Sequence, residues 1–524
     1  MHIDARDYDQ ATLTGDVCVI GGGAAGITLA VALSKSGLST IVVESGGFER
    51  TESTDQLNAA QTPTIGGDYL LRSRVRVFGG TTSHWTGLCL PLADPTFEAR
   101  PWVPNSGWPI DGDVLHSYYQ AACEFVGIEP WGRQGQLTRS PELTTLEFSQ
   151  HPGRFETRIY QVKRRAHFGR RHRDTLTEAE GVILLTHATC TGLEVTGPRV
   201  ERAVVRTLTE RRIAVDAKIF VLAAGGIENA RLLLVSNDAH PKGVGNIHDR
   251  VGRFYMDHPE LTVAEAMVWP GWDLDLYLRG RLGDDSVGFG ALFPTPSFAR
   301  ERGLLQAGIQ IRRSGHRWGT PQGRSLDRAV TTASFRFDCV RGAHPKGACL
   351  PAMQRAALFA RSEQAPDPAN RVVLGETKDV FGVRQPRLEW RMNALDARSL
   401  KQTVQELARA IYRDGLGRVR SFLDHQEIQT LDATYGPSME WEDYDRIHHE
   451  RRPKILLWGH HMGTTRMADS PRHGVVDRNC AVHGIANLYI AGSSVFPTGG
   501  AANPTLTIVA LALRLAEHLQ RTVS

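Results

Sequence analysis

A glycine-rich turn between two apolar segments near the N-terminus constrains the fold of this chain more than any other feature. Residues 16–20 are typical of a short buried strand, a helix is predicted to follow as far as Ser36, and residues 40–44 form a second predicted strand. The glycines between them have the G-x-G-x-x-G offsets, which permit a tight turn, close approach of backbone to a pyrophosphate, and close packing of helix on strand. This order of elements predicts a dinucleotide-binding unit.

The candidate cofactor contacts in this unit are Gly21, Gly23, Ala25, Gly26 and Glu44. Backbone N–H groups at the start of the predicted helix would face the phosphates of the dinucleotide. Glu44 ends the second predicted strand, where a carboxylate can accept hydrogen bonds from a ribose hydroxyl. FAD and NAD are both bound in this way, so the unit by itself leaves the choice of cofactor open.

Length and composition indicate a globular protein with more than one core, or with one large core and an inserted layer. The chain has 524 residues, of which 41% are hydrophobic and 23% charged, so wholesale disorder is excluded. Lysine and arginine (61) exceed aspartate and glutamate (57) by four, and the basic residues are spread along the chain. Nucleic acid is therefore not expected as a partner.

The cysteines and the N-terminus bear on the compartment. Seven scattered cysteines without a C-x-x-C pair fit neither a disulfide scaffold nor a structural zinc site, so a reducing, cytoplasmic location is the default. The first residues lack the basic and apolar regions of a signal peptide, so export is expected only with a partner that carries a signal. The apolar run 17–33 contains four glycines and is too short for a membrane span.

Three further segments carry chemistry. The first is Phe-Gly-Gly-Thr-Thr-Ser-His-Trp-Thr-Gly at 78–87, where small residues would let the backbone lie against a flat ligand. The second, Val-Gly-Arg-Phe-Tyr-Met-Asp-His-Pro at 251–259, follows a strand-like stretch at 219–226 and a predicted helix at 228–235. The third, C-terminal segment contains His-His-Met-Gly-Thr-Thr-Arg-Met at 460–467, Asn-Leu-Tyr-Ile-Ala-Gly at 487–492 and Gly-Ala-Ala-Asn-Pro-Thr-Leu-Thr at 500–507.

Together with the N-terminal unit, these segments resemble the glucose-methanol-choline (GMC) oxidoreductase family of FAD enzymes, and the resemblance covers most of the chain. The offsets at 79–85 and 503–505 look closest to pyranose oxidase and related bacterial sugar oxidoreductases. The resemblance implies that FAD is the cofactor. It adds the following candidate FAD contacts: Gly80, Thr81, His84, Trp85, Cys190, Ala224, Gly492, Asn503, Pro504 and Thr505.

His84 has two interpretations. In pyranose oxidase a histidine at the matching offset is bonded covalently to the flavin 8α carbon, and such a bond would raise the flavin potential. The alternative is an ordinary loop histidine that is hydrogen-bonded to backbone. Covalent attachment of FAD through His84 is therefore a hypothesis.

A buried helix is predicted after Asn503. Asn503 can cap it, Pro504 suits its first position, and the apolar residues that follow indicate burial. Its N-terminus is a positive dipole end that would favour a reduced, negatively charged flavin. Capping alone is the simpler interpretation, and the two roles can coexist.

Oxidation of an alcohol requires a base for the hydroxyl proton, and a neutral histidine suits this task near pH 7. The chain has 20 histidines, so position must discriminate among them. The resemblance points to His460, three residues before the glycine of Gly-Thr-Thr-Arg, with His461 as the alternative because adjacent residues of an extended segment face opposite sides. Asn503 matches the second catalytic position of the family, where it would hydrogen-bond the substrate oxygen.

The predicted fold class is α/β, or α+β overall. A Rossmann-type FAD-binding domain is expected from the separate segments 10–100, 183–260 and 455–524. Residues 101–182 and 261–454 would form a substrate-binding domain with an antiparallel sheet flanked by helices. Its strands are predicted at 262–269, 288–294, 332–340, 371–375 and 387–392, with alternation also at 305–312, and its helix at 396–416, while 312–327 is predicted to be a loop.

These features predict FAD-dependent oxidation of an alcohol group of a sugar, glycoside or polyol, with hydride transfer to flavin N5. Oxygen, a quinone or a redox subunit would accept the electrons, and a homo-oligomer is possible. The alternatives are a lyase of the same family with structural FAD, a dehydrogenase of a non-sugar alcohol, and a regulatory flavin module. A metal site is not expected, because there is no H-E-x-x-H and the adjacent pairs 448–449 and 460–461 lack helical spacing, and no G-x-S-x-G elbow supports a hydrolase.

Overall fold

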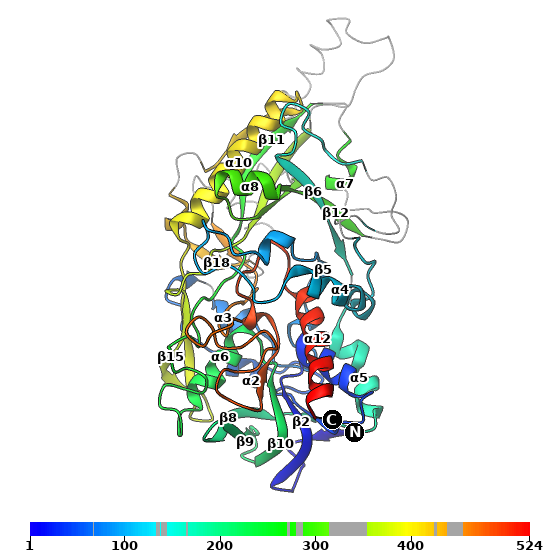
Figure 1. Ribbon diagram of the computed structural model, residues 1–524, viewed down its shortest axis with the longest axis vertical. Coiled ribbons are helices and arrows are strands. Elements are labelled where there is room, and N and C mark those ends of the chain that lie inside the picture. The colour runs from blue at the N-terminus through cyan, green and yellow to red at the C-terminus, as the bar shows by residue number, and fades with distance from the viewer. Residues whose placement is uncertain are drawn as a thin grey trace, which may run out of the picture.

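The computed structural model describes residues 1–66, 68–132, 137, 144–163, 166–269, 273–278, 287–313, 354–423, 427–436 and 454–523. Figure 1 shows an elongated molecule with one sheet at its lower end, near both termini, and a second sheet at its upper end. The predicted α/β class, with a Rossmann-type part and an antiparallel part flanked by helices, is confirmed. In the described part of the chain, no helix is long and apolar enough to cross a membrane.

The lower sheet assembles strands from the N-terminal, central and C-terminal segments, as the motifs predicted. Six of its strands run parallel to their neighbours, and β8 and β9 form an antiparallel extension. In spatial order the strands are β1 (His2–Asp4), β7 (Val182–Thr186), β3 (Thr40–Val43), β2 (Thr12–Ile20), β10 (Arg212–Leu222), β9 (Arg199–Arg206) and β8 (Thr189–Thr196), with β20 (Leu488–Ile490) also paired to β10.

Helices cover this sheet and share its core. The helix of the glycine motif, α1 (Ala24–Leu33), packs against the C-terminal helix α12 (Thr505–Val523) and against α5 (Phe168–Glu178), while α4 (Gly112–Val126) also packs against α12. The helix α6 (Gly225–Val235) packs against β8. The division into two domains at the sequence-based boundaries stays a prediction.

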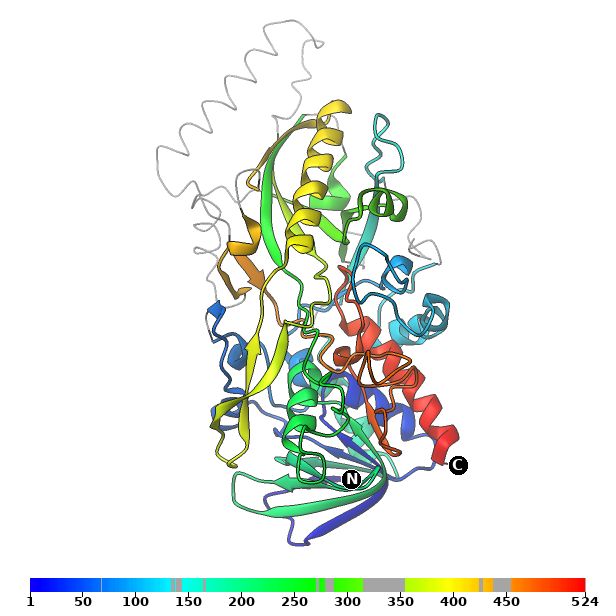
Figure 2. The ribbon, with the colours of Figure 1, turned by 60° about the vertical axis from the view of Figure 1, so that its left-hand side comes forward.

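The upper sheet is mostly antiparallel. Its strand order is β4 (Ile65–Gly66), β18 (Ala433–Tyr435), β19 (Ile455–Leu457), β11 (Glu260–Val268), β14 (Gln354–Ser362), β13 (Ala307–Arg313), β12 (Gly288–Pro294), β6 (Phe155–Val162) and β5 (Leu88–Cys89), with β17 (Gly417–Ser421) also paired to β11. The predicted amphipathic helix is α10 (Ala394–Arg413), which lies along this sheet in Figure 2 and buries Leu400, Val404 and Leu407. A capping box between Asn393 and Asp396 starts this helix.

The remaining described helices are short. They are α2 (Glu52–Asp55), α3 (Tyr69–Arg72), α7 (Asp275–Leu278) and α8 (Pro296–Arg302), and the 3₁₀ helices η1 (Gln56–Asn58), η2 (Gly80–Ser83), η3 (Asp94–Thr96), η4 (Ile428–Thr430) and η6 (Ser493–Val495).

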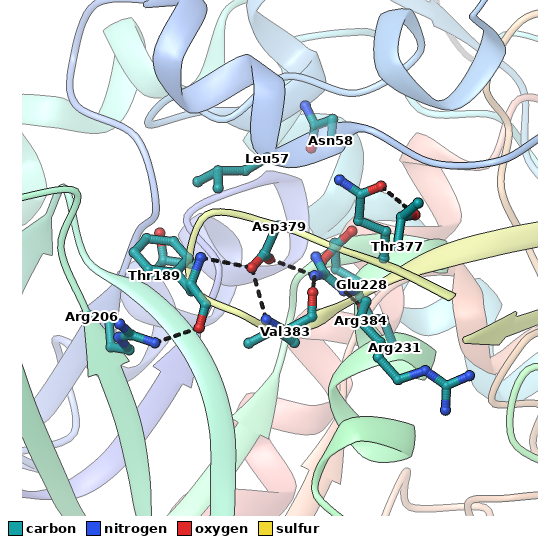
Figure 3. Close-up of polar contacts among 12 residues, drawn as sticks. Leu57, Asn58, Thr189, Arg206, Glu228, Arg231, Thr377, Asp379, Val383 and Arg384 are labelled. Carbon is teal, nitrogen blue, oxygen red and sulfur yellow. Dashed lines mark hydrogen bonds and ion pairs between the residues drawn. The ribbon is translucent and has the colours of Figure 1, made fainter. Parts of the chain in front are cut away.

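The predicted strands at 371–375 and 387–392 do not join the large sheet, so that expectation is wrong. They form a separate hairpin, β15 (Arg371–Lys378) and β16 (Arg384–Glu389). Figure 3 shows the physical reason: Asp379 accepts backbone bonds across the turn and pairs with Arg231 of α6 at 2.6 Å. The hairpin is thereby fixed to the Rossmann-type part. The predicted strand at 332–340, and the predicted loop from 314 onward, lie outside the described residues.

Candidate active site

The predicted cofactor contacts at 21, 224 and 492 follow three neighbouring parallel strands, β2, β10 and β20. Gly21 has φ +112°, and a Cβ there would lie 2.6 Å from the Ala223 carbonyl oxygen. Asn229 accepts a hydrogen bond from Ala224 N at 2.8 Å and donates one to the Ala491 carbonyl at 3.2 Å. Ligands of open α/β sheets bind at the carboxyl ends of the strands, so these three residues lie where a ligand is expected.

The glycines have the geometry that a dinucleotide requires. A Cβ on Gly26 would lie 1.8 Å from the Gly21 carbonyl oxygen, so only glycine allows α1 to pack here. Gly23 begins α1 without a capping side chain, and a Cβ on Gly23 or Gly492 would meet no atom within 4 Å. Ala25 is buried in the first turn of α1. This open helix N-terminus fits the pyrophosphate of FAD.

Glu44 holds the glycine turn. Its carboxylate is buried and accepts hydrogen bonds from Gly22 N at 2.7 Å and Gly46 N at 2.8 Å. Burial raises the pKa of Glu44, although these two N–H groups oppose the shift. The carboxylate therefore fixes the backbone around the site, and its contact with a ribose stays a prediction.

The second glycine segment meets the first. Gly80 has φ +52°, and a Cβ there would lie 3.1 Å from Gly23 Cα. Trp85 donates its indole N–H to the Ala166 carbonyl at 2.8 Å, which ties the loop to the start of α5. Thr81 is exposed on η2, and His84 follows η2 directly. Desolvation and the nearby Arg50 lower the pKa of His84, so its imidazole is neutral.

The remaining predicted cofactor contacts lie at two places. Cys190, on β8, is a thiol that lies 3.5 Å from the Gly192 carbonyl, and burial raises the pKa of this thiol to about 12. Pro504 is buried directly before α12, and Thr505 is the first residue of that helix. The structure brings neither Cys190 nor Thr505 into hydrogen-bond contact with the other predicted residues in the described part of the chain.

The two predicted catalytic residues, 43 positions apart in sequence, lie side by side. His460 Nε2 is 3.4 Å from Asn503 Nδ2. On the other side of the ring, His460 Nδ1 is 2.9 Å from Nδ1 of His258, which is fully buried. Desolvation is the main cause that holds the pKa of His460 well below 6.5, and His258 and Arg361 add to it. His460 is therefore neutral near pH 7.

His461 points elsewhere. Its Nε2 is 3.1 Å from Ser73 Oγ, and its ring packs edge-on against Tyr69 with centroids 5.6 Å apart. Desolvation lowers the pKa of His461 to about 3, and Arg74 contributes to this shift. His461 is thus a buried packing residue on the side of the segment opposite Asn503.

Arg361, on β14, sets the direction of the Asn503 amide. Its guanidinium donates to Asn503 Oδ1 and, through Nε, to Glu260, and both partners are buried. Desolvation opposes the charge of Arg361, but the ion pair with Glu260 outweighs it and raises the pKa of Arg361. Because Oδ1 of Asn503 accepts from Arg361, its Nδ2 donor is the atom that faces His460.

Asp257 anchors the histidine segment. Its Oδ1 accepts backbone N–H bonds from His258 at 2.7 Å and His460 at 3.1 Å, and its Oδ2 accepts from Tyr69. Desolvation raises the pKa of Asp257 to about 6, against the opposing effect of these hydrogen bonds. One carboxylate thus holds two segments that are 203 positions apart in the sequence.

Sequence reasoning missed three residues here: Asp257, His258 and Arg361. The motif at 251–259 includes the first two, and an adjacent Asp-His pair after a turn was the available signal. Arg361 lies in a strand with no motif, so no local pattern distinguishes it.

Among the described residues, no group of His, Cys, Asp and Glu could hold a metal ion, and the pair 448–449 lies outside those residues.

Acidification should destabilise the protein through His461. The pKa is about 3 in the folded state and 6.5 when unfolded, so between these values the unfolded state binds more protons and stability falls as pH falls. Between pH 7 and pH 5 this histidine should account for about 2 kcal/mol of lost unfolding free energy. Urea unfolding of wild type and of His461→Gln at pH 7 and pH 5 measures this loss of unfolding free energy. An equal pH dependence in the two proteins would contradict the assignment.

Comparison with known proteins shows which proteins this chain resembles. Residues 366–512 match the family model described as GMC oxidoreductase, and residues 16–61 match the FAD binding domain model. The fructose dehydrogenase large subunit of Gluconobacter japonicus is 24% identical over 97% of this chain and 98% of its own length. The 2-methyl-1,2-propanediol dehydrogenase of Mycolicibacterium austroafricanum is 25% identical over 66% of this chain and 56% of its own length.

The fold is also similar to that of pyridoxine 4-oxidase from Mesorbium loti, with TM-score 0.53, 15% identity, and coverage of 96% of this chain and 98% of that one. Fold, glycine cradle and family models together define an FAD-dependent oxidoreductase that acts on CH–OH groups. The predicted resemblance to the GMC oxidoreductase family is confirmed by the match of residues 366–512 to its family model.

Proposed function

We propose that this protein oxidises an alcohol group of a sugar, glycoside or polyol, with His460 as the base. The observation that carries the proposal is the convergence of His460 Nε2 and Asn503 Nδ2, 3.4 Å apart. A single oxygen can lie within hydrogen-bond distance of both atoms. A substrate hydroxyl would donate to the histidine and accept from the amide, which suits abstraction of its proton.

The residues of the site have complementary tasks. His460 is neutral, so its ring can take the hydroxyl proton. The Nδ2 donor of Asn503 steadies the negative charge that develops on the substrate oxygen, and Arg361 keeps this donor in place. Bound FAD supplies the acceptor for the hydride that leaves the carbon.

Two relatives support this substrate class. One is named for fructose and another for a vicinal diol, so both names describe polyhydroxylated alcohols. Oxidation of a non-sugar alcohol is the second candidate, which the diol dehydrogenase favours. For the electron acceptor we propose a redox partner, because the fructose dehydrogenase relative is the large subunit of its enzyme. Direct reaction with oxygen is the alternative.

Anaerobic titration of the purified protein with pyranoses, glycosides and polyols tests the function. The visible flavin bands should bleach with one of these compounds, and non-sugar alcohols serve as the comparison series. Bleaching only by non-sugar alcohols would overturn the sugar assignment. Turnover of a substrate while the flavin bands stay oxidised would overturn the redox function and indicate the lyase alternative.

The His84 hypothesis predicts yellow colour in the acid-precipitated pellet of wild type. The bond would join an imidazole nitrogen of His84 to the 8α carbon in place of a C–H bond, with the two electrons left on the flavin and passed on to the electron acceptor of the enzyme. The lowered pKa of His84 provides the neutral imidazole that this bond requires. The His84→Ala variant should bind FAD but release all of it into the acid supernatant. The matched control is His167→Ala. His167 Nδ1 is 3.0 Å from the carbonyl oxygen of Thr82, which lies in the same loop as His84. A colourless wild-type pellet would show that FAD is not covalently bound.

A further inference from the structure

His258 lies behind His460 in a chain of hydrogen bonds. Its Nδ1 is 2.9 Å from Nδ1 of His460, and its Nε2 is 2.9 Å from the Gly500 carbonyl oxygen. The two rings meet nearly edge to face, with centroids 5.0 Å apart and an interplanar angle of 73°. His258 is fully buried and its two ring nitrogens contact His460 and Gly500, so its effect on the reaction would pass through His460.

These hydrogen bonds determine which nitrogen of each imidazole ring carries the hydrogen. A carbonyl oxygen only accepts, so Nε2 of His258 must carry the proton. A neutral imidazole has a single N–H, which leaves a lone pair on Nδ1 of His258. Nδ1 of His460 must then be the donor in the contact between the rings. His460 is left with its lone pair on Nε2, the atom that faces Asn503.

We propose that His258 is a positioning residue that fixes His460 in the tautomer with a free Nε2. This inference rests on the proposed role of His460 as base. When Nε2 accepts the hydroxyl proton, His460 becomes an imidazolium, and its Nδ1–H donates more strongly to the lone pair of His258. No covalent bond of His258 changes, and the proton from the substrate stays on Nε2 of His460.

The buried surroundings suit this task. Desolvation lowers the pKa of His258 to about 3, so its Nδ1 keeps a lone pair at neutral pH. Asp257 holds the backbone of both histidines, as described above. Gly500 has φ +54°, and a Cβ there would lie 2.9 Å from Thr96 Oγ1. The carbonyl group that accepts from His258 therefore belongs to a residue whose conformation favours glycine.

The test compares His258→Leu with His258→Asn in the holoenzyme. Leucine has no acceptor for the Nδ1–H of His460, whereas the side-chain oxygen of asparagine can lie near the position of Nδ1. We expect kcat to fall about 100-fold in His258→Leu with little change in KM, and to recover to within about 10-fold of wild type in His258→Asn. A residue needed only for packing would lower FAD content or melting temperature in both variants, without rescue of kcat by asparagine.

A second readout is independent of turnover. Ring ¹⁵N spectra of histidine-labelled, substrate-free holoenzyme report the tautomer of His460, whose signals are identified by their loss in His460→Ala. We expect Nδ1-protonated His460 in wild type and His258→Asn, and a mixture of tautomers in His258→Leu. An unchanged tautomer and unchanged kcat in His258→Leu would overturn the inference, while wild-type turnover in His460→Ala would instead overturn the proposed function.

Discussion

His460→Ala should lower kcat/KM for the oxidised substrate by about 10³-fold, because general base catalysis contributes roughly 10²–10⁴-fold. The Nε2 atom of His460 lies 3.4 Å from Asn503 Nδ2, whereas the ring of His461 contacts Ser73 and Tyr69. Stopped-flow measurement of the anaerobic reductive half-reaction isolates this step from reoxidation. FAD content and the oxidised spectrum should remain those of wild type.

His461→Ala is the matched control, because it removes the same side chain from the adjacent position. The ring of His461 contacts Ser73 and Tyr69, on the side away from Asn503. The reductive rate of this variant should stay within about 10-fold of wild type, while its stability decreases because a buried ring has been removed. A larger rate loss in His461→Ala than in His460→Ala would contradict the assignment of the base.

Arg361→Met should destabilise the protein by about 3–5 kcal/mol, because it leaves Glu260 as a buried carboxylate without its partner. Glu260 is 1% exposed, so water cannot replace the guanidinium. The same change frees Oδ1 of Asn503, and the amide is no longer held with Nδ2 toward His460. Activity should therefore fall together with stability. Chemical denaturation and steady-state kinetics of the one variant measure both effects.

The double variant Arg361→Met/Glu260→Met separates the two consequences. It removes both charges and replaces them with an apolar pair of similar volume, so most of the lost unfolding free energy should return. The activity should stay low, because the Asn503 amide still lacks its anchor. A stable single variant, or full recovery of activity in the double variant, would contradict the role of Arg361.

The sequence predicted the Rossmann-type part well because its signals are local. Three glycines, two apolar strands and a helix lie within 30 residues, and each element is needed for the next to pack. The strand at 288–294 and the helix predicted at 396–416, which spans 394–413, were found for the same reason, since their residue patterns are local. The hairpin at 371–389 was misplaced, because the ion pair of Asp379 with Arg231 joins residues 148 positions apart.

The sequence by itself determined the glycine motif and, through the family resemblance, the FAD class and a short list of candidate catalytic residues. Only the tertiary structure decided which histidine of the pair 460–461 lies beside Asn503. It also revealed that His258 contacts His460 and that Arg361 contacts Asn503. The reason is physical: a base needs a defined tautomer and an amide needs a defined direction. Hydrogen bonds between side chains 142 to 202 positions apart set both, and no local pattern encodes such contacts.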